Sequence, residues 1–245
     1  MNVVLELYRQ DPASGGEGEF KSYELALEPT DRILDGLIRI SRDMDGSLSF
    51  RKSCAHGVCG SDAMRINGKE RLACKTLVQD VAENEGDVVR IEPLRHMTVQ
   101  RDLMVDQQVF FEKFRSVKPF LIPQDEVQEK ERIQSPEERA LFDEATKCIN
   151  CSACYSACPV LDDNPDFIGP AAIVAAARYV FDSRDQGLEA RLDVLDSKNG
   201  VWPCENHFEC TRVCPRDIKI TKLINLTKRE IKKYREARGE KTAEE

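Results

Sequence analysis

Residues 148–159 read Cys-Ile-Asn-Cys-Ser-Ala-Cys-Tyr-Ser-Ala-Cys-Pro. This Cys-x2-Cys-x2-Cys-x3-Cys-Pro spacing is typical of iron–sulfur ligation on a tight turn. Three thiolates at such short gaps can hold three corners of one cluster, and the fourth cysteine points toward a second cluster. A later group of three cysteines ends with the same Cys-x3-Cys-Pro pattern at Cys210, Cys214 and Pro215. The two groups together predict a pair of iron–sulfur clusters.

In two-cluster ferredoxins, the last cysteine of each group ligates the cluster of the other group. Applied here, this exchange of ligands divides the seven cysteines into two ligand sets. The complete set predicts a [4Fe–4S] cluster and consists of Cys148, Cys151, Cys154 and Cys214. The remaining set predicts a [3Fe–4S] cluster and consists of Cys158, Cys204 and Cys210. Two structural zinc sites are the alternative, since zinc also binds Cys-x2-Cys pairs. His207 is the alternative fourth ligand of the incomplete set.

A third group of cysteines lies earlier in the chain, in the spacing of a plant-type [2Fe–2S] site. Its predicted ligands are Cys54, Cys59, Asp62 and Cys74. Asp62 stands where that spacing has its third cysteine, and either its carboxylate or the neighbouring Ser61 supplies the ligand. Gly57 and Gly60 let backbone amides approach the sulfurs. A carboxylate is a harder ligand than a thiolate, so the site should differ in potential from an all-cysteine one.

Periodicity predicts a small α+β domain around this first cysteine group. Alternating apolar residues at Val3, Leu5 and Leu7 indicate a strand with one buried face. A turn at 15–18 predicts a hairpin with a second strand over 23–27. Asp31 should cap a helix that runs to Arg42, and the pair Asn67-Gly68 favours a type I′ hairpin turn. A further strand is expected over 88–91.

The chain after residue 105 has a different pattern. A charged connecting stretch reaches Gln134, and Ser135-Pro136-Glu137-Glu138 is a strong helix start with a capping box. An apolar helix is expected over 171–181, and the charged tail from Thr227 is expected to be a solvated helix. Residues 1–105 and 106–245 are therefore predicted to be separate domains.

Composition excludes several classes of function. The 245 residues contain 36 Lys and Arg against 44 Asp and Glu, and the net charge of −8 disfavours nucleic-acid binding. The longest apolar run, 171–177, is far shorter than the ~20 residues that span a bilayer. No signal peptide is visible, so any membrane attachment is expected to come from other chains. Ten clustered cysteines in such a chain indicate metal sites rather than disulfides.

The order of the three cysteine groups resembles that of one family, the iron–sulfur subunits of succinate dehydrogenase and fumarate reductase. The stretches that carry the resemblance are 51–62, 72–76, 148–159, 164–171 and 200–215. The resemblance implies an α+β fold in two domains. The first is a β-grasp, plant-type [2Fe–2S] ferredoxin domain, and the second is an all-α, bacterial-ferredoxin-like domain.

The resemblance also implies a linear path for electrons. It runs between FAD on a flavoprotein subunit, the three clusters, and a quinone held with membrane anchor subunits, some of which carry haem b in this family. Succinate and fumarate chemistry belongs to the flavoprotein, so no catalytic residue is expected in this chain. Some members of the family carry Asp at the position of Asp62, which supports its role as a ligand. The expected location is the cytoplasmic face of the bacterial inner membrane.

Departures from the family pattern bear on the quinone. Ubiquinone-linked members carry a Trp soon after the middle Cys-Pro and a His directly after the next cluster cysteine. Here 160–163 contains no Trp, and Glu205 follows Cys204. The run 164–170 looks more like fumarate reductases, so menaquinone is expected, although the all-cysteine [2Fe–2S] loop common in those enzymes is absent.

Two further residues are singled out near the quinone end. Lys228 lies where the family has a quinone-proximal basic residue, and the alternative is a solvated lysine on a charged helix. Trp202, the only tryptophan, is expected to pack close to the [3Fe–4S] cluster.

Overall fold

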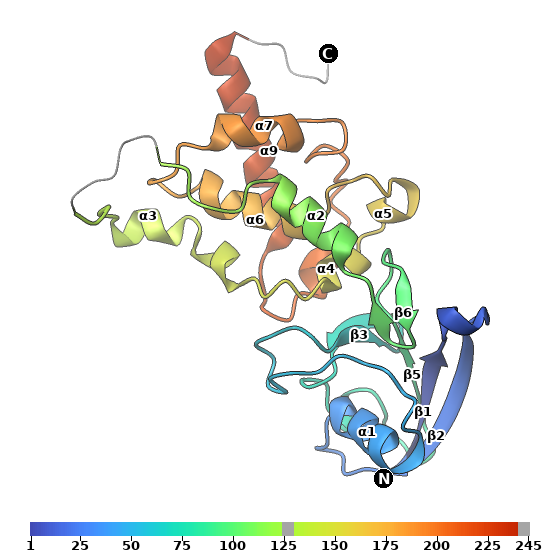
Figure 1. Cartoon of the computed structure of the whole chain (residues 1–245). Coiled ribbons are helices and arrows are strands. Elements are labelled where there is room, and N and C mark those ends of the chain that lie inside the picture. The colour runs from blue at the N-terminus through green and yellow to red at the C-terminus, as the bar shows by residue number, and fades with distance from the viewer. Residues whose placement is uncertain (124–129, 240–245) are drawn as a thin grey trace. The chain divides into compact units, whose positions relative to one another are not determined.

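The computed structural model describes residues 1–123 and 130–239 (Figure 1). The chain divides into two compact units. One consists of Met1–Val109 together with Ile149–Ala157, and the other begins with Phe110–Cys148 and resumes at Cys158. The middle of the 148–159 cysteine run is therefore part of the N-terminal unit.

The N-terminal unit is built on a five-stranded sheet in the order β2-β1-β5-β3-β4 (Figure 1). Its strands are β1 (Asn2–Arg9), β2 (Glu19–Ala26), β3 (Ala63–Ile66), β4 (Lys69–Leu72) and β5 (Val88–Glu92). β1 runs parallel to β5, and the other neighbouring strands are antiparallel. A separate two-stranded ribbon contains β6 (Val99–Arg101) and β7 (Met104–Val105).

The core of this unit follows the predicted alternation. Val3, Leu5 and Leu7 are fully buried on one face of β1, and burying each such side chain contributes about 1.5–3 kcal/mol. The predicted β1–β2 and β3–β4 hairpins are both present. Asn67 and Gly68 have φ of 50° and 75°, as the predicted type I′ turn requires.

The predicted cap of the first helix is wrong. α1 (Ile33–Arg39) is preceded by Arg32, and a π-helical turn, Ile40–Met44, continues it. Asp31 instead accepts a hydrogen bond from the backbone N–H of Glu28 at 2.9 Å. Asp35, inside the first turn, accepts from the Arg32 N–H at 3.0 Å. The side chain of Asp31 is thus used in the preceding turn, and Asp35 satisfies the amide at the helix start.

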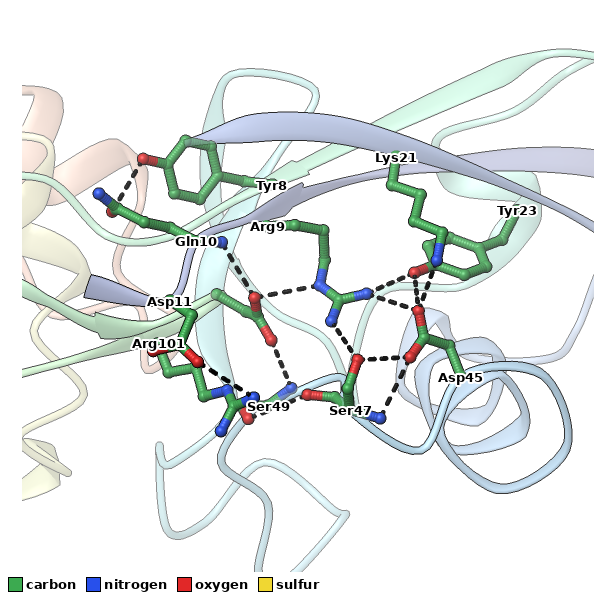
Figure 2. A network of polar contacts seen from close by, with 11 residues as sticks. Tyr8, Arg9, Gln10, Asp11, Lys21, Tyr23, Asp45, Ser47, Ser49 and Arg101 are labelled. Carbon is green, nitrogen blue, oxygen red and sulfur yellow. Dashed lines mark hydrogen bonds and ion pairs between the residues drawn. The ribbon is translucent and has the colours of Figure 1, made fainter. Parts of the chain in front are cut away.

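A polar network fixes the segment that leads into the first cysteine group (Figure 2). Arg9, at the end of β1, pairs with Asp45 at 2.8 Å and with Asp102 at 3.0 Å. It also donates to the Ser47 hydroxyl at 2.8 Å, and Asp102 accepts from the Ser49 N–H at 2.8 Å. Residues 45–49 are therefore held to the sheet immediately before the cysteine loop.

The remaining elements are helical. They are α2 (Gln108–Ser116), α3 (Pro136–Ala140), α4 (Ala153–Ser156, in the N-terminal unit), α5 (Val160–Asp163), α6 (Pro170–Val180), α7 (Leu188–Leu195), α8 (Glu209–Arg212) and α9 (Ile220–Arg238). The predicted capping box is confirmed at α3, where Ser135 and Glu138 bond each other's backbone N–H groups. The predicted apolar helix is α6.

α6 packs against α9. The alanines of α6 are small and buried, which lets the two helices approach closely. The helix predicted from Thr227 is present as part of α9. It begins earlier, at Ile220, and it is not solvated on all sides, because one of its faces is buried. Thr227 and Ile231 are both fully buried on that face. Residues 240–245 of the tail lie outside the described residues.

A buried arginine ties the connecting stretch to α7. Arg191 is fully buried and pairs with Asp185 at 2.7 Å. Its guanidinium also donates to the backbone carbonyls of Val117, Lys118 and Phe120. The first part of the predicted connecting stretch is therefore held in place, while 124–129 lie outside the described residues. Within 1–123 and 130–239, no helix combines the length and the hydropathy needed to cross a bilayer.

Candidate iron–sulfur centres

The loop at Cys54 turns several backbone amides toward one sulfur. The N–H groups of His56, Val58 and Cys59 lie 3.5, 3.4 and 3.3 Å from Cys54 Sγ. These hydrogen bonds lower the pKa of Cys54 to about 6, and the one from His56 has the largest effect. A thiolate is the form that binds iron, so the loop prepares Cys54 as a ligand.

Cys74 and Asp62 complete this site from the β3–β4 side. Cys74 is fully buried. Burial is the main cause that raises its pKa to about 12, and the neighbouring Asp62 is the second. Asp62 is 2% exposed, and its Oδ2 accepts from the Cys74 N–H at 2.6 Å. The charges of Cys54 and Cys74 also influence each other. The structure thus brings the four predicted [2Fe–2S] ligands together.

The donor set at this site fits a metal cluster. Asp62 Oδ1 is buried and has no hydrogen-bond partner within the described part of the chain. A buried, unsatisfied oxygen of this kind costs roughly 1–3 kcal/mol unless another group satisfies it. Ser61, the other candidate ligand, has its hydroxyl 3.1 Å from Cys59 Sγ. The orphaned carboxylate oxygen favours Asp62 over Ser61 as the oxygen ligand.

A second site lies in the helical unit, where Cys158, Cys204 and Cys210 line one small hollow. Burial raises the pKa of Cys158 to about 11, although hydrogen bonds from the backbone of Val160 and Leu161 oppose the shift. The neighbouring cysteines add a smaller rise. Burial also raises the pKa of Cys210, whose Sγ lies 3.6 Å from the Thr221 hydroxyl. The structure therefore brings together the three cysteines predicted for the [3Fe–4S] cluster, and an apolar setting surrounds them.

His207, the alternative fourth ligand, lines the same hollow. Its Nε2 lies 3.3 Å from a carboxylate oxygen of Glu205, and its side chain is 44% exposed. Among the described residues, no three His, Cys, Asp or Glu side chains are arranged to hold a single metal ion.

The four cysteines predicted for the [4Fe–4S] cluster are distributed over the two units. Cys151 and Cys154 are buried in the 149–157 segment of the N-terminal unit. Cys148 and Cys214, both half-buried, belong to the helical unit. Their grouping around one cluster stays a prediction.

Lys228 and Trp202 lie beside the second site. Lys228 Nζ donates to the backbone carbonyl of Cys204 at 2.9 Å and lies 6.0 Å from the centre of the Trp202 ring. Trp202 Nε1 donates to Asp196 at 2.9 Å, and Asp196 also pairs with Arg235. Lys228 is thus half-buried and bound to the backbone of a predicted cluster ligand, unlike the solvated lysine of the alternative interpretation.

A sheet with an amide-rich cysteine loop, followed by helices that gather cysteines, defines a protein with two ferredoxin-type iron–sulfur domains. Residues 4–112 match the family described as "2Fe-2S iron-sulfur cluster binding domain". Residues 144–218, which contain the seven later cysteines, match the family described as "4Fe-4S dicluster domain". The predicted fold class is confirmed.

The chain is also similar to whole proteins. It is 45% identical over 218 residues to the fumarate reductase iron–sulfur subunit of Mycobacterium tuberculosis, covering 88% of this chain and 87% of the relative. It is 36% identical over 231 residues to the succinate dehydrogenase iron–sulfur subunit of Coxiella burnetii, covering 94% and 97%. A chain in the structure called "Mycobacterium smegmatis Sdh1 complex in the apo form" superposes with a TM-score of 0.83 at 30% identity, covering 95% and 96%.

The chain belongs to the family of fumarate reductase and succinate dehydrogenase iron–sulfur subunits. It is an electron-transfer subunit of this oxidoreductase class, and it carries [2Fe–2S] and [4Fe–4S] cluster domains. The resemblance inferred from the cysteine groups is confirmed.

Proposed function

We propose that this chain relays electrons between an FAD-bearing flavoprotein subunit and a quinone in a complex held to the membrane by anchor subunits. When bound, its three iron–sulfur clusters supply one-electron carriers. The observation that carries the proposal is that Cys158, Cys204 and Cys210, the three cysteines of the incomplete set, line one hollow. The relatives named above are subunits of enzymes that interconvert succinate and fumarate, which supports the same partners here.

The proposed role of this chain's residues is to bind the clusters and to keep water away from them. Backbone N–H groups stabilise the Cys54 thiolate, and the carboxylate of Asp62 is the proposed oxygen ligand of the [2Fe–2S] cluster. Burial of Cys158 and Cys210 keeps water away from the proposed [3Fe–4S] cluster. Nothing in this role requires a general acid or base, so the succinate chemistry is assigned to the flavoprotein.

The ligands of the [4Fe–4S] cluster are proposed to be Cys148, Cys151, Cys154 and Cys214. The matching family is described as a dicluster domain, and its match covers all four of these cysteines. The ferredoxin exchange of ligands supports the assignment.

The quinone end is proposed to lie beside Lys228 and Trp202. Lys228 reaches the Cys204 carbonyl, so a positive charge stands next to the proposed [3Fe–4S] site. Glu205 in place of a histidine after Cys204 supports menaquinone. The proposed location is the cytoplasmic face of the bacterial inner membrane, with haem b, where present, on the anchor subunits.

Electron paramagnetic resonance of the purified complex tests the proposal. As isolated, it should show an oxidised [3Fe–4S] signal, and dithionite should add reduced [2Fe–2S] and [4Fe–4S] signals. Iron should be present at about nine atoms per chain, the total of the three clusters. A colourless sample that contains zinc and no iron would refute the proposal.

A further inference from the structure

The loops that hold two different proposed clusters touch inside the N-terminal unit. Gly60 directly follows the proposed [2Fe–2S] ligand Cys59, and Cys151 is a proposed [4Fe–4S] ligand. A Cβ added at Gly60 would lie 2.6 Å from Cys151 Cβ and 3.0 Å from Cys151 Cα. Real Cβ atoms do not approach so closely, so the absence of a side chain at residue 60 is what allows this contact.

The partner atoms at this contact cannot easily move away. The Cα and Cβ of Cys151 are not the end of a flexible side chain, and their movement would displace the ligand sulfur. Asn150 and Ser152 on either side both have positive φ, of 53° and 64°, as a tight turn requires. Ile149 Cδ1, the third neighbour at 3.3 Å from the added Cβ, is the end of a side chain and can yield, so the clash with Cys151 decides the effect.

The segment 149–157 is held to the sheet from its other end as well. Ser156 is fully buried, and its hydroxyl donates to Glu70 on β4 at 2.8 Å. The same hydroxyl accepts from the backbone N–H of Arg95 at 2.8 Å. α4 packs directly on β4. Because the Ser156 end of the segment is held to the sheet, extra volume at Gly60 has to be taken up at Cys151, which separates the two ligand loops.

We propose that Gly60 is a positioning residue that sets the spacing between the [2Fe–2S] and [4Fe–4S] clusters by packing against Cys151. This inference rests on the cluster assignments of the proposed function. Electron transfer between two centres slows steeply as their separation grows, so a backbone contact at this point keeps the pair close. Ser156 and Glu70 support the same spacing by holding the other end of the segment.

The test compares Gly60→Ala with the wild-type complex after reduction by dithionite. Magnetic coupling to a reduced [4Fe–4S] cluster speeds the spin relaxation of a reduced [2Fe–2S] cluster, and the effect weakens with distance. Gly60→Ala should keep the iron content and both signals, while the microwave power that half-saturates the [2Fe–2S] signal falls. Unchanged saturation with both clusters retained would overturn the proposal.

Gly86→Ala is the matched control. Gly86 lies in the same unit with φ +84°, so alanine brings a similar backbone strain, but its added Cβ would meet nothing within 4 Å among the described residues. This variant should saturate like the wild type. If it shows the same drop as Gly60→Ala, backbone strain rather than the contact with Cys151 explains the effect, and the proposal fails.

Ser156→Ala decides the question if Gly60→Ala loses a cluster. It leaves the [2Fe–2S] loop unchanged and releases the far end of the 149–157 segment. Slower relaxation in this variant supports the proposal, and wild-type relaxation overturns it. Absence of both signals from the wild-type complex would instead refute the proposed function, and this inference with it.

Discussion

The loop around Cys54 and the hollow around Cys158 prepare their sulfurs in opposite ways. Cys54 is partly exposed, and backbone amides lower its pKa to about 6. Cys158 is buried, and the loss of water raises its pKa to about 11. Hydrogen bonds favour the charged thiolate, whereas burial disfavours it. At neutral pH the loop therefore favours the thiolate of Cys54, whereas Cys158, like the buried Cys74 of the first site, is held as a neutral thiol.

The two regions also differ in how their ligands meet. Cys54 and Cys59 are brought together by a few residues of loop, so local spacing is sufficient. Cys158 and Cys204 are separated by α5, α6 and α7 along the chain, so the hollow exists only after the helices have packed. The first site should therefore respond mainly to changes in its own loop, and the second to changes anywhere in the helical unit.

The largest expected effect is loss of the second site in Cys204→Ser. One of only three thiolates is removed, so the oxidised [3Fe–4S] signal should vanish. Quinone reduction should stop, while reduction of the flavin by succinate survives because it precedes this cluster. Electron paramagnetic resonance and the two activities measure the effect, and retained quinone reduction would contradict the assignment.

His207→Ala is the matched control for that experiment. His207 lines the same hollow, but its imidazole is part-exposed and faces Glu205. The [3Fe–4S] signal should persist in this variant. Its loss would mean that His207 is a ligand and that the site is not a three-thiolate site.

At the first site, replacing Asp62 should cause a smaller effect, a partial loss of the [2Fe–2S] cluster. Asp62→Ala removes the proposed oxygen ligand and should lower the iron retained at the [2Fe–2S] site. Asp62→Cys should keep the cluster but shift its potential, because a thiolate is a softer ligand. Redox titration followed by the [2Fe–2S] signal measures both effects.

Ser61→Ala separates the two candidate oxygen ligands. Ser61 contacts Cys59 Sγ through its hydroxyl, so this variant tests the neighbour of Asp62 without removing the carboxylate. It should retain the cluster. If both Asp62 variants have wild-type spectra and potentials while Ser61→Ala loses iron, Ser61 is the ligand.

Local patterns in the sequence predict much of this molecule. The alternation at Val3, Leu5 and Leu7, the Asn67-Gly68 turn and the capping box at Ser135 each depend on neighbours in the chain, and the structure contains all three. The cysteine spacings likewise identify the protein family, because ligands on one turn must be close in sequence.

Contacts between distant segments could not be predicted in the same way. The buried face of α9 at Thr227 and Ile231 lies in a highly charged stretch, where only packing against α6 reveals it. Ser156 looks like a small residue between two cysteines, yet it bonds Glu70 far earlier in the chain. The local sequence pattern does not indicate such long-range contacts, since they depend on how the elements pack.

Arg191→Met tests whether the helical unit depends on such distant contacts. Arg191 and Asp185 are both fully buried, and removing one partner leaves a buried charge and several carbonyls without a donor. The free energy of unfolding should fall by about 3–5 kcal/mol. Denaturant unfolding followed by helical circular dichroism measures it.

Arg212→Met is the matched surface change in the same unit. Arg212 pairs with Glu209 one turn away, and its side chain is 65% exposed. An exposed pair of this kind contributes at most about 1 kcal/mol. If the two variants unfold alike, the buried arginine does not organise the helical unit.

The smallest expected effect concerns Asp45, which braces the segment before the first cysteine loop. Hydrogen bonds from Lys21 first, and then from Ser47, Tyr23 and Arg9, hold the pKa of Asp45 well below its usual range. Asp45→Asn should lower the free energy of unfolding by about 1–2 kcal/mol near neutral pH, since solvent screens part of the interaction. The side chain is 13% exposed, so some of that effect should survive screening.

The pH dependence of this variant has a definite sign. The folded pKa of Asp45 is depressed, so its contribution is full above the unfolded value, about 3.9, and is lost as the pH falls toward the folded value. The difference between wild type and Asp45→Asn should therefore be constant from neutral pH down to about 5 and shrink in stronger acid. Asp43→Asn is the control, since the Asp43 carboxylate pairs with the adjacent Arg42 on the surface. A difference that grows as the pH falls would show that the carboxylate of Asp45 does not stabilise the fold through its charge.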